Sequence, residues 1–304
     1  MSKRTKPKAT IRSWIAGARL RTLPLAVAPV VVGYGIASVM QSASIALTLL
    51  ALAVSVFLQV GVNFANDYSD GIRGTDDFRV GPMRLTASGS VEPKKVRNAA
   101  FAFFGLAGVA GLLLVVQSGL WWLIAVGAAC IVAAWFYTGG KRPYGYAGLG
   151  EVFVFVFFGL VATFGTVAIQ VKNFFLSADG LIWTTGAAVA MGLFASAVLM
   201  VNNIRDIDTD RVAGKKTLAA RVGRKWAKAF YLAFIWTPMV LLFPYILVFQ
   251  RAGFAYFVLL LILPLTLIVI TAESSREYIL ALKLTSYATL AYAVLLAYGM
   301  VVIA

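Results

Sequence analysis

The chain has 304 residues, of which 61% are hydrophobic and only 13% charged, and its formal net charge is +15. This apolar content exceeds the roughly 45–50% of soluble domains and indicates a polytopic helical membrane protein. The chain contains no histidine and a single cysteine, Cys130, which excludes intrachain disulfides, thiolate metal clusters, zinc–histidine sites and bis-histidine haem.

Apolar runs close to the ~20 residues that span a bilayer recur along the chain and predict an all-α fold with nine transmembrane helices. The predicted helices lie near 23–41, 45–66, 97–117, 121–138, 150–170, 181–204, 229–249, 253–272 and 280–303. We expect a basic cytoplasmic segment over residues 1–22. Residues 23–304 are expected to form a single transmembrane domain around a central cavity.

The distribution of basic residues predicts how these helices are oriented. With the N-terminus in the cytoplasm, the loops after the second, fourth, sixth and eighth helices fall on the same side. Lysine and arginine gather on these loops, the adjoining helix ends and the N-terminal segment, with Lys172 and Arg251 as exceptions. The positive-inside rule therefore predicts a multi-pass protein of the cell membrane with an external C-terminus. Two long cytoplasmic loops, about 67–96 and 205–228, are expected to cap the cavity.

The most polar stretch, NFANDYSDGIRGTDD, follows the second predicted helix directly. Asn66 and Asp70 are four residues apart, which places them on one helix face. Gly71 and Gly74 are expected to end the helix and let the chain turn back, so Asp76 lies beyond the turn.

A second polar stretch, VNNIRDIDTDRVAGKK, follows the sixth predicted helix. Asn202, Asp206 and Asp210 recur at intervals of four along one face, whereas Asp208 points roughly opposite. One such cluster is equally typical of solvated helix ends paired with nearby arginines. Two clusters in matching positions on one side of the membrane favour a shared functional site.

The chemistry of these residues indicates a magnesium and diphosphate site. Packed carboxylates repel one another unless a positive group lies between them. Carboxylate and carboxamide oxygens suit Mg²⁺, which takes one or two carboxylates together with the oxygens of a bound phosphate. The candidate diphosphate-binding residues are Arg84, Lys215, Lys216 and Arg221. A polyprenyl diphosphate, with a hydrocarbon tail and a charged head that leaves as the allylic bond ionises, matches this pattern.

At these residues the sequence resembles the UbiA superfamily of intramembrane aromatic prenyltransferases, whose members carry Asn/Asp-rich motifs after the second and sixth helices. The resemblance covers nearly the whole chain and implies that both motifs bind Mg²⁺ and diphosphate. The implied metal ligands are Asn66, Asp70, Asp76, Asn202, Asp206 and Asp210, and the implied catalytic residues are Asp70, Asp206 and Asp210. Gly74 stands where many members have the last aspartate of the first motif, and Asp76 takes its place.

The stretches ARLRTLPLAVAPVVVG, NDYSDGIRGTDDFRVGPMRLTASG, YTGGKRPYGYAGLGEVFVFVFFG and NNIRDIDTDRVAGKKTLAARVG are similar to the menaquinone-pathway branch. This resemblance implies prenylation of 1,4-dihydroxy-2-naphthoate at its carboxylate-bearing carbon, with loss of CO₂, to give demethylmenaquinone. The candidate acceptor-binding residues are Arg19, Arg21, Tyr137, Lys141, Arg142, Tyr144 and Tyr146. Glu151, which begins the fifth predicted helix, is interpreted as a partner of the helix dipole.

Three other functions fit parts of the pattern. A prenyltransferase of another aromatic acceptor, such as 4-hydroxybenzoate, would share the same diphosphate site. A membrane cation transporter would instead place carboxylates near the middle of the bilayer on discontinuous helices. A CDP-alcohol phosphotransferase is suggested by DYSDG, but the Ala-Arg pair expected after the glycine is missing.

Overall fold

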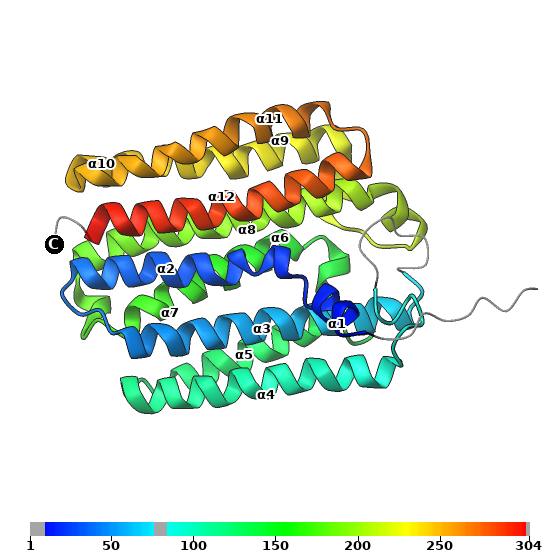
Figure 1. The fold of residues 1–304 in the computed structure, drawn as a ribbon, viewed down its shortest axis with the longest axis horizontal. Coiled ribbons are helices and arrows are strands. Elements are labelled where there is room, and N and C mark those ends of the chain that lie inside the picture. The colour runs from blue at the N-terminus through cyan, green and yellow to red at the C-terminus, as the bar shows by residue number, and fades with distance from the viewer. Residues whose placement is uncertain (1–9, 76–83, 302–304) are drawn as a thin grey trace, which may run out of the picture.

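The computed structural model describes residues 10–75 and 84–301, and every element of secondary structure in these residues is helical (Figure 1). The elements in chain order are α1 Ile11–Ala18, η1 Leu20–Thr22, α2 Pro24–Val39, α3 Ile45–Ile72, α4 Pro93–Ser118, α5 Leu123–Phe136, η2 Tyr144–Ala147, α6 Gly150–Val154, η3 Phe155–Val161, α7 Ala162–Ala168, η4 Phe174–Leu176, α8 Ala178–Val212, α9 Leu218–Leu241, α10 Phe243–Val248, η5 Gln250–Val258, α11 Leu259–Thr271 and α12 Ser275–Val301.

The described residues contain seven helices that are long and apolar enough to cross a membrane. An eighth span forms if Ile11–Thr22 and Pro24–Val39, which meet at a bend of 47°, are counted as one. The remaining apolar helix, α5, has only 14 residues, fewer than the ~20 that a perpendicular span requires. The multi-pass architecture is therefore confirmed, whereas the count of nine spans is not.

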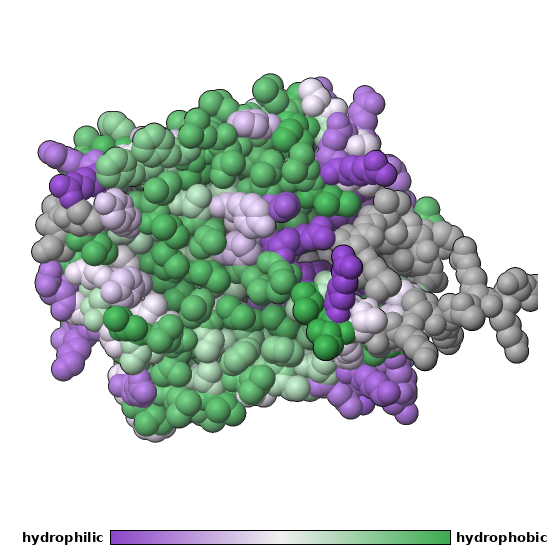
Figure 2. All heavy atoms as spheres, in the orientation of Figure 1, coloured by the Kyte–Doolittle hydropathy of each residue, from purple (hydrophilic) through white to green (hydrophobic). Residues whose placement is uncertain are grey.

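The long helices lie side by side along the longest axis of the molecule (Figure 1). Figure 2 shows a broad hydrophobic band across their middle, with hydrophilic side chains gathered at both ends. Helices α2, α8, α9 and α12 share one large buried core, and α3 and α4 form a second. This arrangement is expected of a helical bundle embedded in lipid, where only inward-facing contacts are buried within the protein.

The expected loop over 205–228 is wrong, because α8 continues to Val212 and α9 begins at Leu218. The polar end of α8 remains helical beyond the apolar run, since its aspartates and arginines face water or one another rather than lipid. Thr217 caps α9 by accepting a hydrogen bond from the Ala220 amide at 3.4 Å. A short turn, 213–217, is all that separates the two helices.

The two glycines after the first polar cluster have different roles. Gly74 has φ = 70° just beyond the end of α3, a conformation that favours glycine at a helix C-terminus. Gly71 remains inside α3, where the turn around Thr86 packs against it. A Cβ atom at position 71 would lie 2.4 Å from Thr86 Cγ2, so no larger residue fits without displacing that turn.

A π-helix, η3, interrupts the span that runs from Gly150 to Ala168. It packs closely on α8, and a Cβ atom at Gly159 would lie 2.5 Å from the Cα atom of Gly192. Extra residues in a helical turn rotate the side chains that follow. Phe157 and Phe158 of this segment line the central cavity.

The helix α1 was not predicted, since residues 1–22 were expected to form only a basic segment. Thr10 and Ser13 cap it reciprocally. Ile11 is 81% exposed and Ile15 is half-exposed, whereas Ser13 and Gly17 are buried. The helix therefore presents an apolar face outward beside the polar end of α3 (Figure 1).

Candidate active site

A cavity of about 740 Å³ lies between α3, α4 and α5 on one side and α2, α6–α7 and α8 on the other. Its charged lining residues are Arg19, Asp70, Arg84, Asp206, Asp210 and Lys215. Most of the remaining lining is aliphatic or aromatic. The stretch of α3 from Ala51 to Asp70, whose two ends both line the cavity, is about 28 Å long. The cavity thus joins a charged end to an apolar channel comparable in depth to the bilayer core.

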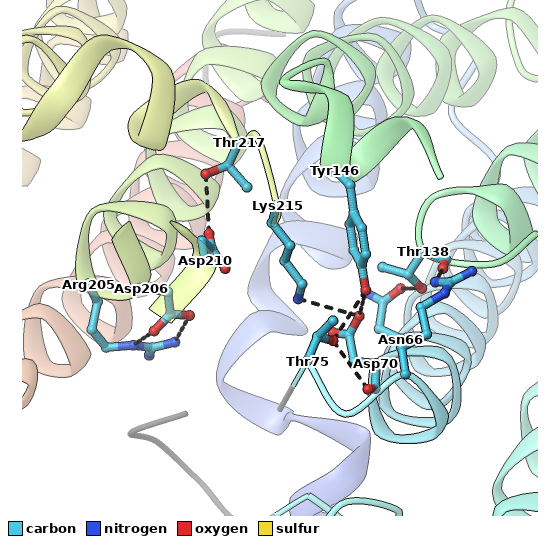
Figure 3. A network of polar contacts seen from close by, with 11 residues as sticks. Asn66, Asp70, Thr75, Thr138, Tyr146, Arg205, Asp206, Asp210, Lys215 and Thr217 are labelled. Atoms are coloured by element: carbon cyan, nitrogen blue, oxygen red, sulfur yellow. Dashed lines mark hydrogen bonds and ion pairs between the residues drawn. The ribbon is translucent and has the colours of Figure 1, made fainter. Parts of the chain in front are cut away.

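The first polar cluster lies at the end of α3, where both of its described members are buried. Asn66 accepts a hydrogen bond from Thr138 at 2.8 Å, which fixes the carboxamide (Figure 3). Asp70 accepts a hydrogen bond from the Tyr146 phenol and forms an ion pair with Lys215, with 3.5 Å between Nζ and Oδ1. Asp76 lies outside the described residues.

Asp67 has a structural role that the sequence did not reveal. Its side chain is buried, and both carboxylate oxygens accept backbone hydrogen bonds at 2.9 Å, from Leu85 and Thr86. These two bonds hold the turn that packs on Gly71. Because Arg84 immediately precedes this turn and lines the cavity, Asp67 fixes the backbone beside one of the candidate diphosphate ligands.

The second cluster occupies one face of α8. Asn202, Asp206 and Asp210 line the same cavity as Asn66 and Asp70. Asp208 points away, where it is largely exposed and pairs with Arg224 at 3.0 Å. The helical spacing thus places Asp208 on the opposite face of α8 from the other three residues, as the periodicity predicts.

Two neighbouring residues orient the carboxylates of this second cluster. Arg205 donates to both oxygens of Asp206 at 2.7 Å and to the side-chain oxygen Oδ1 of Asn202 at 2.9 Å. Thr217 donates to Asp210 at 3.2 Å. Asp206 is therefore both paired with an arginine and part of the cavity wall.

Lys215 connects the two clusters. It comes from the turn after α8, yet its ammonium group reaches Asp70 on α3 and lies 4.6 Å from the centre of the Tyr146 ring (Figure 3). The side chains of Lys215 and Asp70 are only 10% and 7% exposed. This contact places a positive charge between the acidic groups of the two helices, as their mutual repulsion requires.

An aromatic wall follows the charged end of the cavity. Tyr144 stacks on Phe153 with 4.0 Å between ring centroids and meets Tyr137 edge-on at 5.5 Å. Burial raises the pKa of the Tyr144 phenol above its ordinary value, and the phenol donates to the Ala133 carbonyl at 2.8 Å. Burial, reinforced by Asp70, likewise raises the pKa of the Tyr146 phenol. Both phenols therefore remain neutral hydrogen-bond donors.

The remaining predicted residues divide between the cavity and the surface. Arg19 and three tyrosines, Tyr137, Tyr144 and Tyr146, line the cavity, as do Arg84 and Lys215. The predicted residues that do not line it are Arg21, Lys141, Arg142, Lys216 and Arg221. Arg221 instead donates to the carbonyls of Lys216 and Ala147, both at 2.9 Å, and so ties the α8–α9 turn to η2.

The donor set fits Mg²⁺ by its chemistry, since carboxylate and carboxamide oxygens from two helices line one cavity. Over residues 10–75 and 84–301, no group of three or more His, Cys, Asp or Glu side chains is close enough to hold an ion by itself. Asparagine and substrate oxygens would have to complete the coordination, which is how Mg²⁺ is usually bound beside phosphates.

Two polar residues in the cavity wall escaped the sequence analysis. Thr138 and Thr217 each donate to a side chain of one Asn/Asp cluster, but a threonine near a helix end has no sequence signal that distinguishes this role. Glu151 lies in the first turn of α6, as a dipole partner would, but it is also buried and bonded to Asn203, which the sequence analysis did not anticipate. A glutamate inside an apolar span was the available signal.

Comparisons with known proteins agree with this architecture. The model of the UbiA prenyltransferase family matches residues 26–277. The chain is 51% identical over 236 residues to 1,4-dihydroxy-2-naphthoate octaprenyltransferase of Mycobacterium tuberculosis, covering 77% of this chain and 78% of that protein. It is 52% identical over 227 residues to the Mycobacterium leprae protein of the same name, covering 75% of each. A UbiA homolog from Archaeoglobus fulgidus, solved with GPP and Mg²⁺, superimposes with a TM-score of 0.60 at 14% identity, covering 94% of this chain and 99% of that one. The chain therefore belongs to the UbiA prenyltransferase family.

Proposed function

We propose that the protein transfers a polyprenyl chain from polyprenyl diphosphate to 1,4-dihydroxy-2-naphthoate. The carboxylate-bearing ring carbon is alkylated, and CO₂ and diphosphate are released, giving demethylmenaquinone in its quinol form. The observation that carries the proposal is that the Asn/Asp clusters of α3 and α8 line one end of a cavity whose remainder is mainly apolar. The names of the two mycobacterial relatives support the choice of acceptor.

The cavity suits the two ends of a polyprenyl diphosphate. Its charged end would receive the head, and its aliphatic and aromatic walls would receive the tail without exposing it to water. Those walls would also exclude water from the allylic cation that forms when the diphosphate leaves, and the aromatic faces of Tyr137 and Phe153 would stabilise its charge.

We propose that Asn66, Asp70, Asn202, Asp206 and Asp210 hold Mg²⁺ through their oxygens, with Asp76 as a further predicted ligand outside the described residues. Bound there, Mg²⁺ would neutralise charge that develops on the departing diphosphate. The solved Archaeoglobus fulgidus homolog with GPP and Mg²⁺ supports this assignment at the level of the family.

Lys215 and Arg84 are the proposed protein ligands of the diphosphate. Both line the charged end of the cavity, and Lys215 already reaches between the two clusters. The bridging oxygen of the prenyl diphosphate is uncharged in the substrate and becomes an oxyanion as the C–O bond breaks. Charge-assisted hydrogen bonds from such groups stabilise the oxyanion more than the uncharged oxygen.

Arg19 is the proposed partner of the acceptor carboxylate. It lines the cavity, and its buried Nη2 has no hydrogen-bond partner in the part of the chain that the structure describes. A buried guanidinium nitrogen without a partner is costly, and a bound carboxylate would satisfy it. Tyr137, Tyr144 and Tyr146 would enclose the rings of the naphthoate.

We further propose that the protein resides in the cell membrane with its charged cavity end toward the cytoplasm. The support is the concentration of lysine and arginine on the segments at that end. Both the water-soluble naphthoate and the released diphosphate would then exchange with the cytoplasm.

The test uses purified protein in detergent, polyprenyl diphosphate, Mg²⁺ and a panel of aromatic acceptors. We expect 1,4-dihydroxy-2-naphthoate to give CO₂ and a prenylated naphthoquinol, and 4-hydroxybenzoate to give no product. Chelation should stop turnover, and added Mg²⁺ should restore it. Prenylation of 4-hydroxybenzoate in place of the naphthoate would overturn the acceptor, and ion flux without prenyl transfer would overturn the enzyme.

A further inference from the structure

A buried carboxylate, that of Glu151, lies outside the two Asn/Asp clusters. Glu151 is in the first turn of α6, within the apolar span that continues to Ala168, and is only 4% exposed. Its Oε1 accepts a hydrogen bond from the Asn203 side chain at 2.9 Å. Its backbone carbonyl accepts another from Ser196 at 3.0 Å, so two bonds tie the start of α6 to α8.

The carboxylate dictates which way the Asn203 carboxamide faces. Asn203 Nδ2 donates to Glu151 Oε1, so the amide nitrogen of Asn203, and not its oxygen, faces Glu151. The side-chain oxygen of Asn203, Oδ1, accepts no hydrogen bond within residues 10–75 and 84–301, and Asn203 lines the cavity. The pair therefore presents a fixed hydrogen-bond acceptor to whatever occupies the cavity.

The Asn203 side chain lies beside the aromatic wall. Gly150, next to Glu151, packs on Tyr137, whose Oη would be 3.3 Å from a Cβ atom at position 150. Tyr137 and Tyr144 in turn form the edge-on pair of that wall. A ligand ring enclosed by the tyrosines would thus lie near Asn203.

A purely structural function explains the pair poorly. A buried ionisable group is expensive inside a membrane protein, and an apolar pair of similar size usually stabilises a fold equally well. Moreover, Glu151 Oε2 is buried and has no hydrogen-bond partner among the described residues. Besides tying α6 to α8, this arrangement fixes the orientation of Asn203.

We propose that Asn203 Oδ1 accepts a hydrogen bond from a hydroxyl group of the aromatic acceptor, and that Glu151 is the positioning residue that holds the carboxamide in this orientation. The assignment rests on the proposed function. A hydroxyl that donates such a bond releases more electron density into its ring, which favours attack on an allylic cation. The same contact would select hydroxylated acceptors, because a site built to bind a hydroxyl discriminates against analogues that lack it.

The test compares inhibitors that differ by one hydroxyl. Wild-type protein and Asn203→Ala are assayed with 1,4-dihydroxy-2-naphthoate, using 1-hydroxy-2-naphthoate and 4-hydroxy-2-naphthoate as competitive inhibitors. We expect the substitution to lower kcat/KM about tenfold, the usual effect of one such hydrogen bond. For the inhibitor that keeps the bonded hydroxyl, the substitution should raise the inhibition constant by about the same factor. For the inhibitor that lacks this hydroxyl, the inhibition constant should not change. Equal weakening of both inhibitors, or of neither, would overturn the assignment.

Asn63→Ala is the matched control. Asn63 is also a buried asparagine that lines the cavity, but its nitrogen donates to the Ala18 carbonyl at 2.9 Å in a contact between α3 and the N-terminal segment. Any effect of this control should be the same for both inhibitors. If Asn63→Ala weakened the two inhibitors as unequally as Asn203→Ala does, general distortion of the cavity would explain the effect. That result would overturn the proposal.

Two substitutions at Glu151 test the positioning role. Glu151→Gln keeps an oxygen that accepts from Asn203 and should keep activity within about threefold. Glu151→Leu removes that oxygen and should match Asn203→Ala, with no further loss in the double variant. A Gln variant as impaired as the Leu variant would overturn positioning, because it would make the charge itself essential. Absence of turnover by the wild-type protein would instead overturn the proposed function, and this assignment with it.

Discussion

Replacing Lys215 by methionine tests the connection between the two clusters most directly. Methionine keeps the length and apolar stem of the side chain but removes the charge that lies 3.5 Å from Asp70. We expect a large loss of activity with little loss of fold. Tyr146 still donates to Asp70 in the variant, so the carboxylate keeps one partner.

The size of the effect follows from the contact. At an effective dielectric constant near 20, two unit charges at this separation interact by about 5 kcal/mol, most of which desolvation offsets in the resting protein. A charge-assisted hydrogen bond to the diphosphate contributes about 1.5–3 kcal/mol net. At 1.36 kcal/mol for each factor of ten in rate, its loss lowers kcat/KM by about 10- to 150-fold.

The neighbouring residue supplies the control. Lys216 carries the same charge one position later, but it is exposed and does not line the cavity. Lys216→Met should therefore retain kcat/KM within about twofold, with both variants assayed for prenylated naphthoquinol and for thermal unfolding in detergent. Equal activity of the two folded variants would refute the assignment of Lys215 to the diphosphate.

Three further predictions follow from the same geometry. Asp70→Asn and Asp206→Asn should each abolish turnover at saturating Mg²⁺ while leaving the unfolding temperature within a few degrees, and retained activity in both would remove the metal assignment. Asp67→Asn should lower the free energy of unfolding by about 2–3 kcal/mol, because the amide NH₂ group would face one of the two backbone N–H groups that the carboxylate now accepts from. Asp67→Ala is the comparison. An unchanged unfolding curve for either variant would contradict the role of this carboxylate. Because burial raises the pKa of Tyr144 above its unfolded value of 10.0, the folded state keeps a proton that the unfolded state loses. The stability from this group should thus be present below pH 10 and decline above it, so the difference in unfolding temperature between wild type and Tyr144→Phe should shrink from pH 9 to pH 11; a constant difference would contradict it.

Much of the helical architecture could be predicted because lipid imposes a simple rule, an apolar run of fixed length for each span. The rule fails at its margins. It marks the end of the hydrocarbon rather than the end of the helix, so it stopped the sixth predicted helix at 204, whereas α8 continues to Val212. It also cannot separate a full span from the 14-residue α5 when turn residues flank both.

The site could be predicted where the periodicity of one helix determines it. The i, i+4 spacing placed Asp206 and Asp210 on one face and Asp208 on the other, as the structure has them. Loop residues were beyond such reasoning. Lys215 and Lys216 are indistinguishable in sequence, and the path of the turn after α8 alone decides which of them enters the cavity.

The pairing of Lys215 with Asp70 has a consequence for how the protein is made. Translation produces the acidic tip of α3 early, whereas its countercharge follows only after α4 through α8 have emerged from the ribosome. Until then these carboxylates must remain hydrated, since burying them alone is prohibitively costly. The charged end of the cavity between α3 and α8 is therefore expected to close late in biogenesis, and a chain truncated before residue 215 should insert its first helices yet leave that end open to protease.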